Sequence, residues 1–153
     1  MSKLFYFCFM LKRTYNILLV EDNPGDIRII KEVLSKSRFS TNLITVFDGE
    51  DVISYLEQAS LKLKSFPDII ILDLNLPKLN GIEVIREIKS KKKFRQIPII
   101  ILTSSKSDID INDAYKNYAN SYIVKPINFN DYSENFLEIL EYWFNIASLP
   151  YSK

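Results

Sequence analysis

Apolar residues in this chain form short continuous runs that alternate with longer segments of helical periodicity. Each run holds four to six mainly apolar residues and is followed by a polar residue, which is typical of buried β-strands. Five such runs occur, and a segment with apolar residues spaced three or four apart follows each of them. The predicted strands cover residues 15–20, 43–47, 68–72, 98–102 and 121–124.

The segments between the runs carry helix signals. Asn23 and Pro24 supply a cap and a first helical position, and Ser107 can cap the fourth helix. Residues 59–67 are expected to form a linker, and the last helix is expected over about 128–145.

Two of the predicted strands indicate the fold class. Residues 68–72 and 98–102 read DIIIL and PIIIL, so their apolar residues point to both faces of a sheet. A parallel sheet covered by helices on both sides requires this pattern. Strand and helix alternate five times. The sequence therefore predicts an α/β domain with a doubly wound five-stranded parallel sheet and helices on both faces.

The pattern also predicts the domain limits. We expect a single domain over residues 15–146, an amino-terminal tail over 1–14 and a carboxy-terminal tail over 147–153. Residues 4–11 are all apolar, but eight residues are too few to cross a bilayer, which takes about 20. A signal peptide would carry its charge before the apolar run, whereas Lys12 and Arg13 follow it. Met10 is an alternative start for the protein.

Composition excludes several classes of function. The 20 basic and 19 acidic residues leave a net charge of +1, which argues against binding nucleic acid through bulk charge. The chain has no histidine, so imidazole catalysis and imidazole metal sites are excluded. One cysteine cannot form an intramolecular disulfide, which favours a reducing, cytoplasmic location. A bound metal would therefore be a hard cation with oxygen ligands.

Polar side chains follow the predicted strands at their carboxyl ends. Glu21 and Asp22 follow the first strand, Asp73 the third, Thr103 the fourth and Lys125 the fifth. The carboxyl ends of parallel strands meet at one edge of a sheet, which is where such folds bind ligands. Three carboxylates at one edge favour a bound cation, and Mg²⁺ accepts oxygen ligands.

A phosphoryl group suits the remaining chemistry of this edge. The cation, Lys125 and the Thr103 hydroxyl would surround the Asp73 carboxylate and stabilise negative charge there. Asp73 is thus a candidate nucleophile that forms an aspartyl phosphate. Asp68 begins its strand, so we expect it at the opposite edge of the sheet.

Four sequence blocks are LLVEDN at 18–23, ILDLNLPKLNG at 71–81, ILTSS at 101–105 and YIVKP at 122–126. They resemble the four blocks of the response-regulator receiver domain, which has a flavodoxin-like fold. The blocks stand in the family's order and each lies at an expected strand end. The resemblance extends over about residues 15–145.

The resemblance implies roles for the acidic residues. Asp73 matches the phosphoacceptor, and Glu21 and Asp22 match the family's acidic pair. Asp22 and Asp73 would bind Mg²⁺ directly, Asn75 would contribute its backbone carbonyl, and Glu21 would act through a metal-bound water. Many receivers carry two aspartates where this chain has Glu21 and Asp22, and glutamate is a known variant.

It also implies roles beyond the metal. Lys125 matches the lysine that binds the phosphoryl group, and a cis peptide bond is expected before Pro126. Thr103 matches the switch hydroxyl, and Tyr122 matches the aromatic residue that changes rotamer with it.

Residues 97–126 and 141–150 further resemble the stand-alone regulators paired with phytochrome-type histidine kinases. This resemblance implies phosphorylation by such a kinase, or by another sensor kinase, and signalling through protein binding without an output domain. It implies no membrane partner and no enzymatic activity apart from self-dephosphorylation.

The last predicted helix carries more aromatic residues than one sheet face needs. Tyr132, Phe136, Tyr142, Trp143 and Phe144 are expected to exceed what one sheet face can bury. We expect the surplus to form a homodimer, or to receive residues 147–150 of the same chain.

Two other functions stay open from the residues alone. A haloacid-dehalogenase-type phosphatase also uses a strand-end aspartate and Mg²⁺, but it needs an acidic residue where this chain has Asn75. A degenerate receiver could act only as an interaction scaffold, although Asp22, Asp73, Thr103 and Lys125 are all present.

Overall fold

The computed structural model describes residues 13–150, and these form one five-stranded sheet. All strand pairs are parallel, and the strand order is β2-β1-β3-β4-β5. The predicted doubly wound fold is confirmed. The strands are β1 (Thr14–Val20), β2 (Ser40–Val46), β3 (Ile69–Leu72), β4 (Ile99–Thr103) and β5 (Ser121–Val124).

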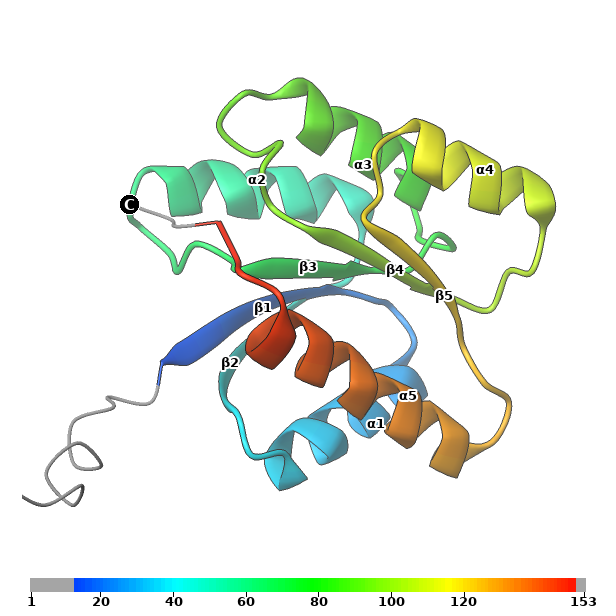
Figure 1. Cartoon of the computed structure of the whole chain (residues 1–153). Helices are drawn as coiled ribbons and strands as arrows, with labels where there is room; N and C mark the ends of the chain where they lie inside the picture. Colours follow the sequence, from blue (N-terminus) through cyan, green and yellow to red (C-terminus); the bar gives the residue numbers. More distant parts are fainter. Residues whose placement is uncertain (1–12, 151–153) are drawn as a thin grey trace, which may run out of the picture.

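Helices cover both faces of the sheet (Figure 1). Helices α1 (Pro24–Lys36) and α5 (Phe129–Glu141) lie on one face. Helices α2 (Gly49–Ser60), α3 (Gly81–Ser90) and α4 (Asp108–Lys116) lie on the other. Each face buries its own apolar cluster, and every residue of β3 and β4 is buried between the two.

Strand β1 lies between β2 and β3, so the chain changes direction across the sheet at this point. Such a switch point leaves a crevice at the carboxyl ends of the two diverging strands. The register aligns Val20 at the end of β1 with Leu72 at the end of β3. Glu21 and Asp73, the next residues along each strand, therefore begin at the same level of the sheet.

Element boundaries differ from prediction at the edge strand and the helix that follows it. Strand β2 begins at Ser40, three residues before the expected start, because Ser40, Thr41 and Asn42 pair with the first residues of β1. An edge strand is half exposed, so polar residues extend it without disturbing the apolar pattern. Helix α2 also continues through Ala59 and Ser60 into the expected linker.

The end of the last helix corrects the expectation of surplus aromatic surface. Helix α5 continues as a π-helical turn, Tyr142–Ile146, closed by a 2.7 Å hydrogen bond from the Ala147 amide to the Tyr142 carbonyl. The wider turn places Phe144 inside, where it stacks on Tyr15 with ring centres 4.0 Å apart. Tyr132, Phe136 and Phe144 are all buried in the domain's own core.

Most of the amino-terminal tail predicted over residues 1–14 lies outside the described residues. Its last residue, Thr14, already belongs to β1. The apolar run at 4–11 lies outside the described residues. Among residues 13–150, no helix is long and apolar enough to cross a membrane.

We expect replacement of Gly81 by alanine to destabilise the fold through the loop that follows β3. A Cβ atom at Gly81 would lie 2.6 Å from Leu74 Cα and 2.7 Å from the Asp73 carbonyl oxygen. Both are backbone atoms, so the loop must move, and we expect a loss of about 1–3 kcal/mol in urea unfolding. Gly25→Ala is the control, because its new Cβ would meet only the Asn23 side chain, at 3.1 Å. Equal stability of both variants would contradict this reasoning.

Candidate functional site

Charged side chains from three strand ends meet at the switch point. Glu21 and Asp22 follow β1, Asp73 follows β3 and Lys125 follows β5. The Lys125 ammonium lies 2.9 Å from Asp73 Oδ2 and 2.5 Å from Glu21 Oε2. The structure thus brings together four of the residues that the sequence places at this edge.

Lys125 has a third carboxylate partner that the sequence analysis missed. Asp26 Oδ2 lies 2.8 Å from the ammonium and comes from the first turn of α1. The Asn23 side chain caps this helix and accepts a hydrogen bond from the Asp26 amide. An acidic residue in a first helical turn is common, so the sequence signal for Asp26 is weak; its proximity to Lys125 comes from how α1 packs on the sheet.

The carboxylates of Glu21, Asp22 and Asp73 form a cluster that suits a divalent cation. One oxygen each from Glu21, Asp22 and Asp73 lie within 4.8 Å of one another. Glu21 and Asp73 are buried, whereas Asp22 is exposed. Burial raises the pKa of Glu21, and hydrogen bonds from Lys125 and Asn23 oppose that shift. A hard cation with oxygen ligands would relieve the repulsion among these groups, so the residues fit Mg²⁺.

Hydrogen bonds already occupy carboxylate oxygens of Glu21 and Asp73. Glu21 Oε1 accepts from the Asn23 amide and Oε2 from Lys125, so both its oxygens already have donors. The Asn75 amide donates to Asp73 Oδ1 at 3.2 Å, which holds the loop after β3 against the carboxylate.

An open cavity of about 420 Å³ lies at this edge of the sheet, and Glu21 does not line it. The buried Tyr132 side chain lines it, and its hydroxyl has no hydrogen-bond partner among the described residues. Burial raises the pKa of this hydroxyl, so it remains a neutral phenol. The polar residues around the cavity include Asp22, Asp26, Asp73, Asn75, Lys125 and Tyr132.

Thr103 and Tyr122 lie behind the cavity and do not line it. Thr103 is fully buried at the end of β4, and its hydroxyl accepts a 3.5 Å hydrogen bond from the Ser105 amide. The half-buried Tyr122 donates its hydroxyl to the Ser105 carbonyl at 3.1 Å. The backbone of Ser105 therefore connects the two residues, and Ser104 is the member of this loop that reaches the cavity.

The cis peptide bond expected before Pro126 is absent, since no peptide bond in residues 13–150 is cis. The two isomers before a proline differ by only about 0.5–1 kcal/mol, so the presence of Pro126 does not determine which one forms.

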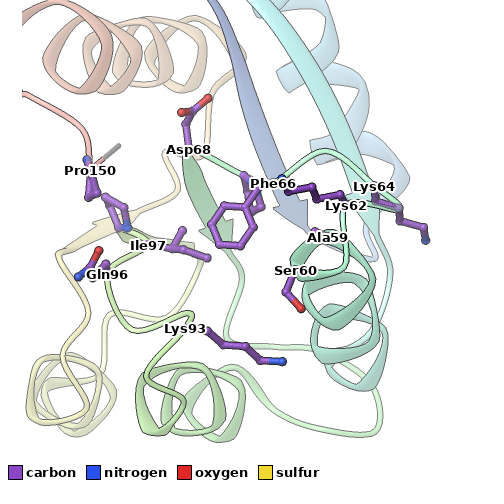
Figure 2. A pocket seen from close by; sticks show the side chains of 12 residues that line it. Ala59, Ser60, Lys62, Lys64, Phe66, Asp68, Lys93, Gln96, Ile97 and Pro150 are labelled. Atoms are coloured by element: carbon purple, nitrogen blue, oxygen red, sulfur yellow. The ribbon is translucent and has the colours of Figure 1, made fainter. Parts of the chain in front are cut away.

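Asp68 lies away from this site, as its position at the start of β3 predicts. Its carboxylate accepts hydrogen bonds from the Arg13 side chain at 2.6 Å and from the Asn16 amide at 2.7 Å. It borders a separate cavity of about 540 Å³ at the amino ends of the strands, with Phe66, Ile97 and Lys93 nearby (Figure 2). None of the predicted site residues lines that cavity.

Comparison with known proteins identifies the family. Residues 17–136 match the response regulator receiver domain. The chain is 39% identical to the probable methanogenesis regulatory protein FilR2 of Methanothrix harundinacea over 127 residues, which cover 83% of this chain and 82% of FilR2. It is 36% identical to the response regulator Rcp1 of Synechocystis over 135 residues, which cover 88% of this chain and 92% of Rcp1.

Solved structures agree in fold over nearly the whole length. The phosphorylated cyanobacterial phytochrome response regulator RcpA superposes with a TM-score of 0.86 at 40% identity, covering 91% of this chain and all of RcpA. The Mn²⁺-bound form of Rcp1 superposes with a TM-score of 0.84 at 36% identity, covering 90% of this chain and 99% of Rcp1.

The chain belongs to the response regulator receiver domain family of two-component signalling and is related to the phytochrome response regulators. Receiver domains bind Mg²⁺ or Mn²⁺ at an acidic pocket, and this chain has an acidic cluster at the corresponding edge of its sheet. Members of the family act in general as phosphoacceptors and not as enzymes.

We expect Mg²⁺ to raise the melting temperature in the absence of any phosphoryl donor, because the cation relieves repulsion in the cluster. At a concentration ten times its Kd, a ligand specific for the folded state adds about 1.4 kcal/mol. Asp22→Ala should lose most of this gain, and Asp51→Ala on α2 is the control. Thermal melts with and without Mg²⁺ measure the effect. An equal response of wild type and Asp22→Ala would place the metal elsewhere.

Proposed function

We propose that this protein accepts a phosphoryl group on Asp73 from a histidine kinase, with Mg²⁺, and signals through phosphorylation-dependent protein binding. The observation that supports this most is the contact between the buried Asp73 carboxylate and the Lys125 ammonium beside the acidic pair. The same edge holds a nucleophile, a fixed positive charge and oxygen ligands for a cation. Phosphoryl transfer depends on this combination.

In the proposed reaction, a carboxylate oxygen of Asp73 attacks the phosphorus of a phosphohistidine. A bond forms between oxygen and phosphorus while the bond between phosphorus and the imidazole nitrogen breaks. The bonding electron pair leaves with the imidazole nitrogen, so the chain needs no base of its own. This agrees with the absence of histidine from the sequence and with a donor that arrives already activated.

The site residues divide the work around that oxygen. Lys125 stabilises the negative charge of the transferring group, because its ammonium is held at the carboxylate and its side chain is only 8% exposed. Hydrogen bonds to Asp26 and Glu21 outweigh burial and raise the pKa of Lys125, so the ammonium stays charged. Asp22, Asp73 and the Asn75 carbonyl would hold Mg²⁺, and Glu21 would act through a metal-bound water. When bound, the metal supplies charge neutralisation at the phosphoryl oxygens.

Thr103 and Tyr122 would carry the signal away from Asp73. We infer that the Thr103 hydroxyl turns toward the phosphoryl group and loses the hydrogen bond that it accepts from the Ser105 amide. The Ser105 carbonyl also accepts a hydrogen bond from the Tyr122 hydroxyl, so a movement of Ser105 would release the Tyr122 side chain. Two alternative arrangements of one hydrogen-bonded loop are the kind of element that a modification can bias.

The proposed phosphoryl donor is a histidine kinase of the phytochrome type or another sensor kinase. The support is the similarity to Rcp1 and to RcpA, which is a phytochrome response regulator. A cytoplasmic location agrees with the single cysteine of the sequence. The balanced charge gives no support for a nucleic-acid partner.

Acetyl phosphate with Mg²⁺ should label the wild type on a single residue and leave Asp73→Asn unlabelled. The amide keeps the size and hydrogen-bonding shape of the carboxylate but removes the nucleophilic oxygen. Mass spectrometry or a phosphate-affinity gel measures the labelling.

Asp68→Asn is the matched control, because Asp68 is equally close to a strand end but lies at the other edge of the sheet. It should be labelled like the wild type. Equal labelling of Asp73→Asn would overturn the assignment, and an unlabelled wild type would favour a degenerate receiver that acts as a scaffold.

We also propose that a second copy of the chain binds the face formed by α4, β5 and α5. Strand β5 is an edge of the sheet, and a groove of about 660 Å³ lies beside it, lined by Ile123, Tyr142 and Trp143. Tyr142 is 52% exposed and Tyr115 on α4 is 49% exposed. An isologous dimer would cover the same edge and the same apolar side chains on both subunits.

The structure changes which residues test this dimer. Phe144 is buried in the domain's own core, so its replacement would unfold the protein rather than split a dimer. We expect wild type to sediment as a dimer and Tyr142→Ser with Trp143→Ser to sediment as a monomer. Leu63→Ser is the control, because Leu63 is 72% exposed but lies outside this face. A wild type that stays monomeric at high concentration, with and without a phosphoryl mimic, would refute the dimer.

A further inference from the structure

The Lys125 ammonium has no free hydrogen-bond donor in this structure. An ammonium group carries three N–H bonds. Lys125 contacts three carboxylate oxygens, from Glu21 at 2.5 Å, Asp26 at 2.8 Å and Asp73 at 2.9 Å. A phosphoryl group on Asp73 brings further oxygens that need a donor. Lys125 can bind one of them only by weakening or releasing a contact that it already makes.

Asp26 is the partner that Lys125 can release at least cost. Its side chain is 22% exposed, compared with 2% for Glu21 and 8% for Asp73, so water can replace the lysine most readily there. Asp26 does not belong to the cluster of carboxylates that could hold a metal. No other cation forms an ion pair with it among the described residues.

Asp26 also adds negative charge to the cavity that would receive the phosphoryl group. It lines this cavity together with Asp22 and Asp73. A carboxylate at this position repels an incoming anion and attracts the ammonium that should bind it. Both effects act in the same direction and disfavour the phosphorylated state.

We propose that Asp26 is a positioning residue that competes with the phosphoryl group for Lys125 and so limits how strongly the site holds that group. This inference rests on the proposed function of Asp73 as phosphoacceptor. A competitor for Lys125 and a structural support of Lys125 predict opposite changes in the affinity for the phosphoryl group when Asp26 is replaced. Loss of a competitor strengthens binding of the phosphoryl group, whereas loss of a support weakens it.

The test measures the affinity of the full chain for beryllofluoride, an anionic mimic of the phosphoryl group, by calorimetric titration at saturating Mg²⁺. Asp26→Asn keeps a hydrogen-bond acceptor of the same size and removes the charge. It should bind the mimic about two- to fivefold more tightly than wild type, which is the range that one partly exposed charge pair contributes. The difference should shrink as salt is added.

Three further variants make the result specific. Asp26→Glu retains the charge and should bind like wild type. Asp26→Ser also removes the charge and should bind more tightly, which covers the case that Asp26→Asn folds poorly. Glu32→Gln removes an exposed carboxylate from the same helix and should have no effect. Saturating Mg²⁺ prevents a change in metal affinity from appearing as a change in affinity for the mimic.

Unchanged or weaker binding by Asp26→Asn and Asp26→Ser would overturn the competition. Failure of the proposed function looks different, because wild type and Asp73→Asn would then bind the mimic equally or not at all. Weaker binding by Asp26→Glu together with Asp26→Asn would instead identify Asp26 as a support of Lys125.

Discussion

The ion cluster around Lys125 is the interaction on which the site depends. Isolated buried charges cost several kcal/mol each, so a lysine whose side chain is only 8% exposed requires partners. Glu21 after β1, Asp26 in the first turn of α1 and Asp73 after β3 provide them, and all three are distant in sequence from Lys125. The cluster therefore holds the carboxyl edge of the sheet together and keeps Asp73 next to a positive charge.

The sheet makes this arrangement possible without being part of the chemistry. Strands β3 and β4 are buried on both faces, and this fixes where their ends lie. The reversal of strand order at β1 leaves a crevice at the carboxyl ends of β1 and β3. Asp22, Asp73 and Lys125, which follow three of the strands, thus line a partly open cavity, whereas Thr103 is fully buried and does not line it.

Hydrogen bonds link the loop after β4 to the face formed by α4 and β5. Tyr122 lies on β5 and donates its hydroxyl to Ser105, so the loop after β4 and the edge strand share a hydrogen bond. Tyr115 on α4 accepts a hydrogen bond from the Tyr122 amide at 3.1 Å. The loop after β4 is therefore connected by hydrogen bonds to β5 and, through Tyr122, to α4. Proximity alone would not couple two parts of the molecule, because coupling needs an element with two arrangements.

Local patterns in the sequence were sufficient for the five strands, the order of helices and the strand-end positions of Asp73 and Lys125, because apolar periodicity and capping act between near neighbours. Contacts between distant elements required the tertiary structure. The proximity of Asp26 to Lys125 depends on how α1 packs, and no local pattern encodes it. The burial of Phe144 depends on a π-helical turn and on a site to receive its ring beside Tyr15. These features follow from packing in three dimensions, which residue spacing along the chain does not determine.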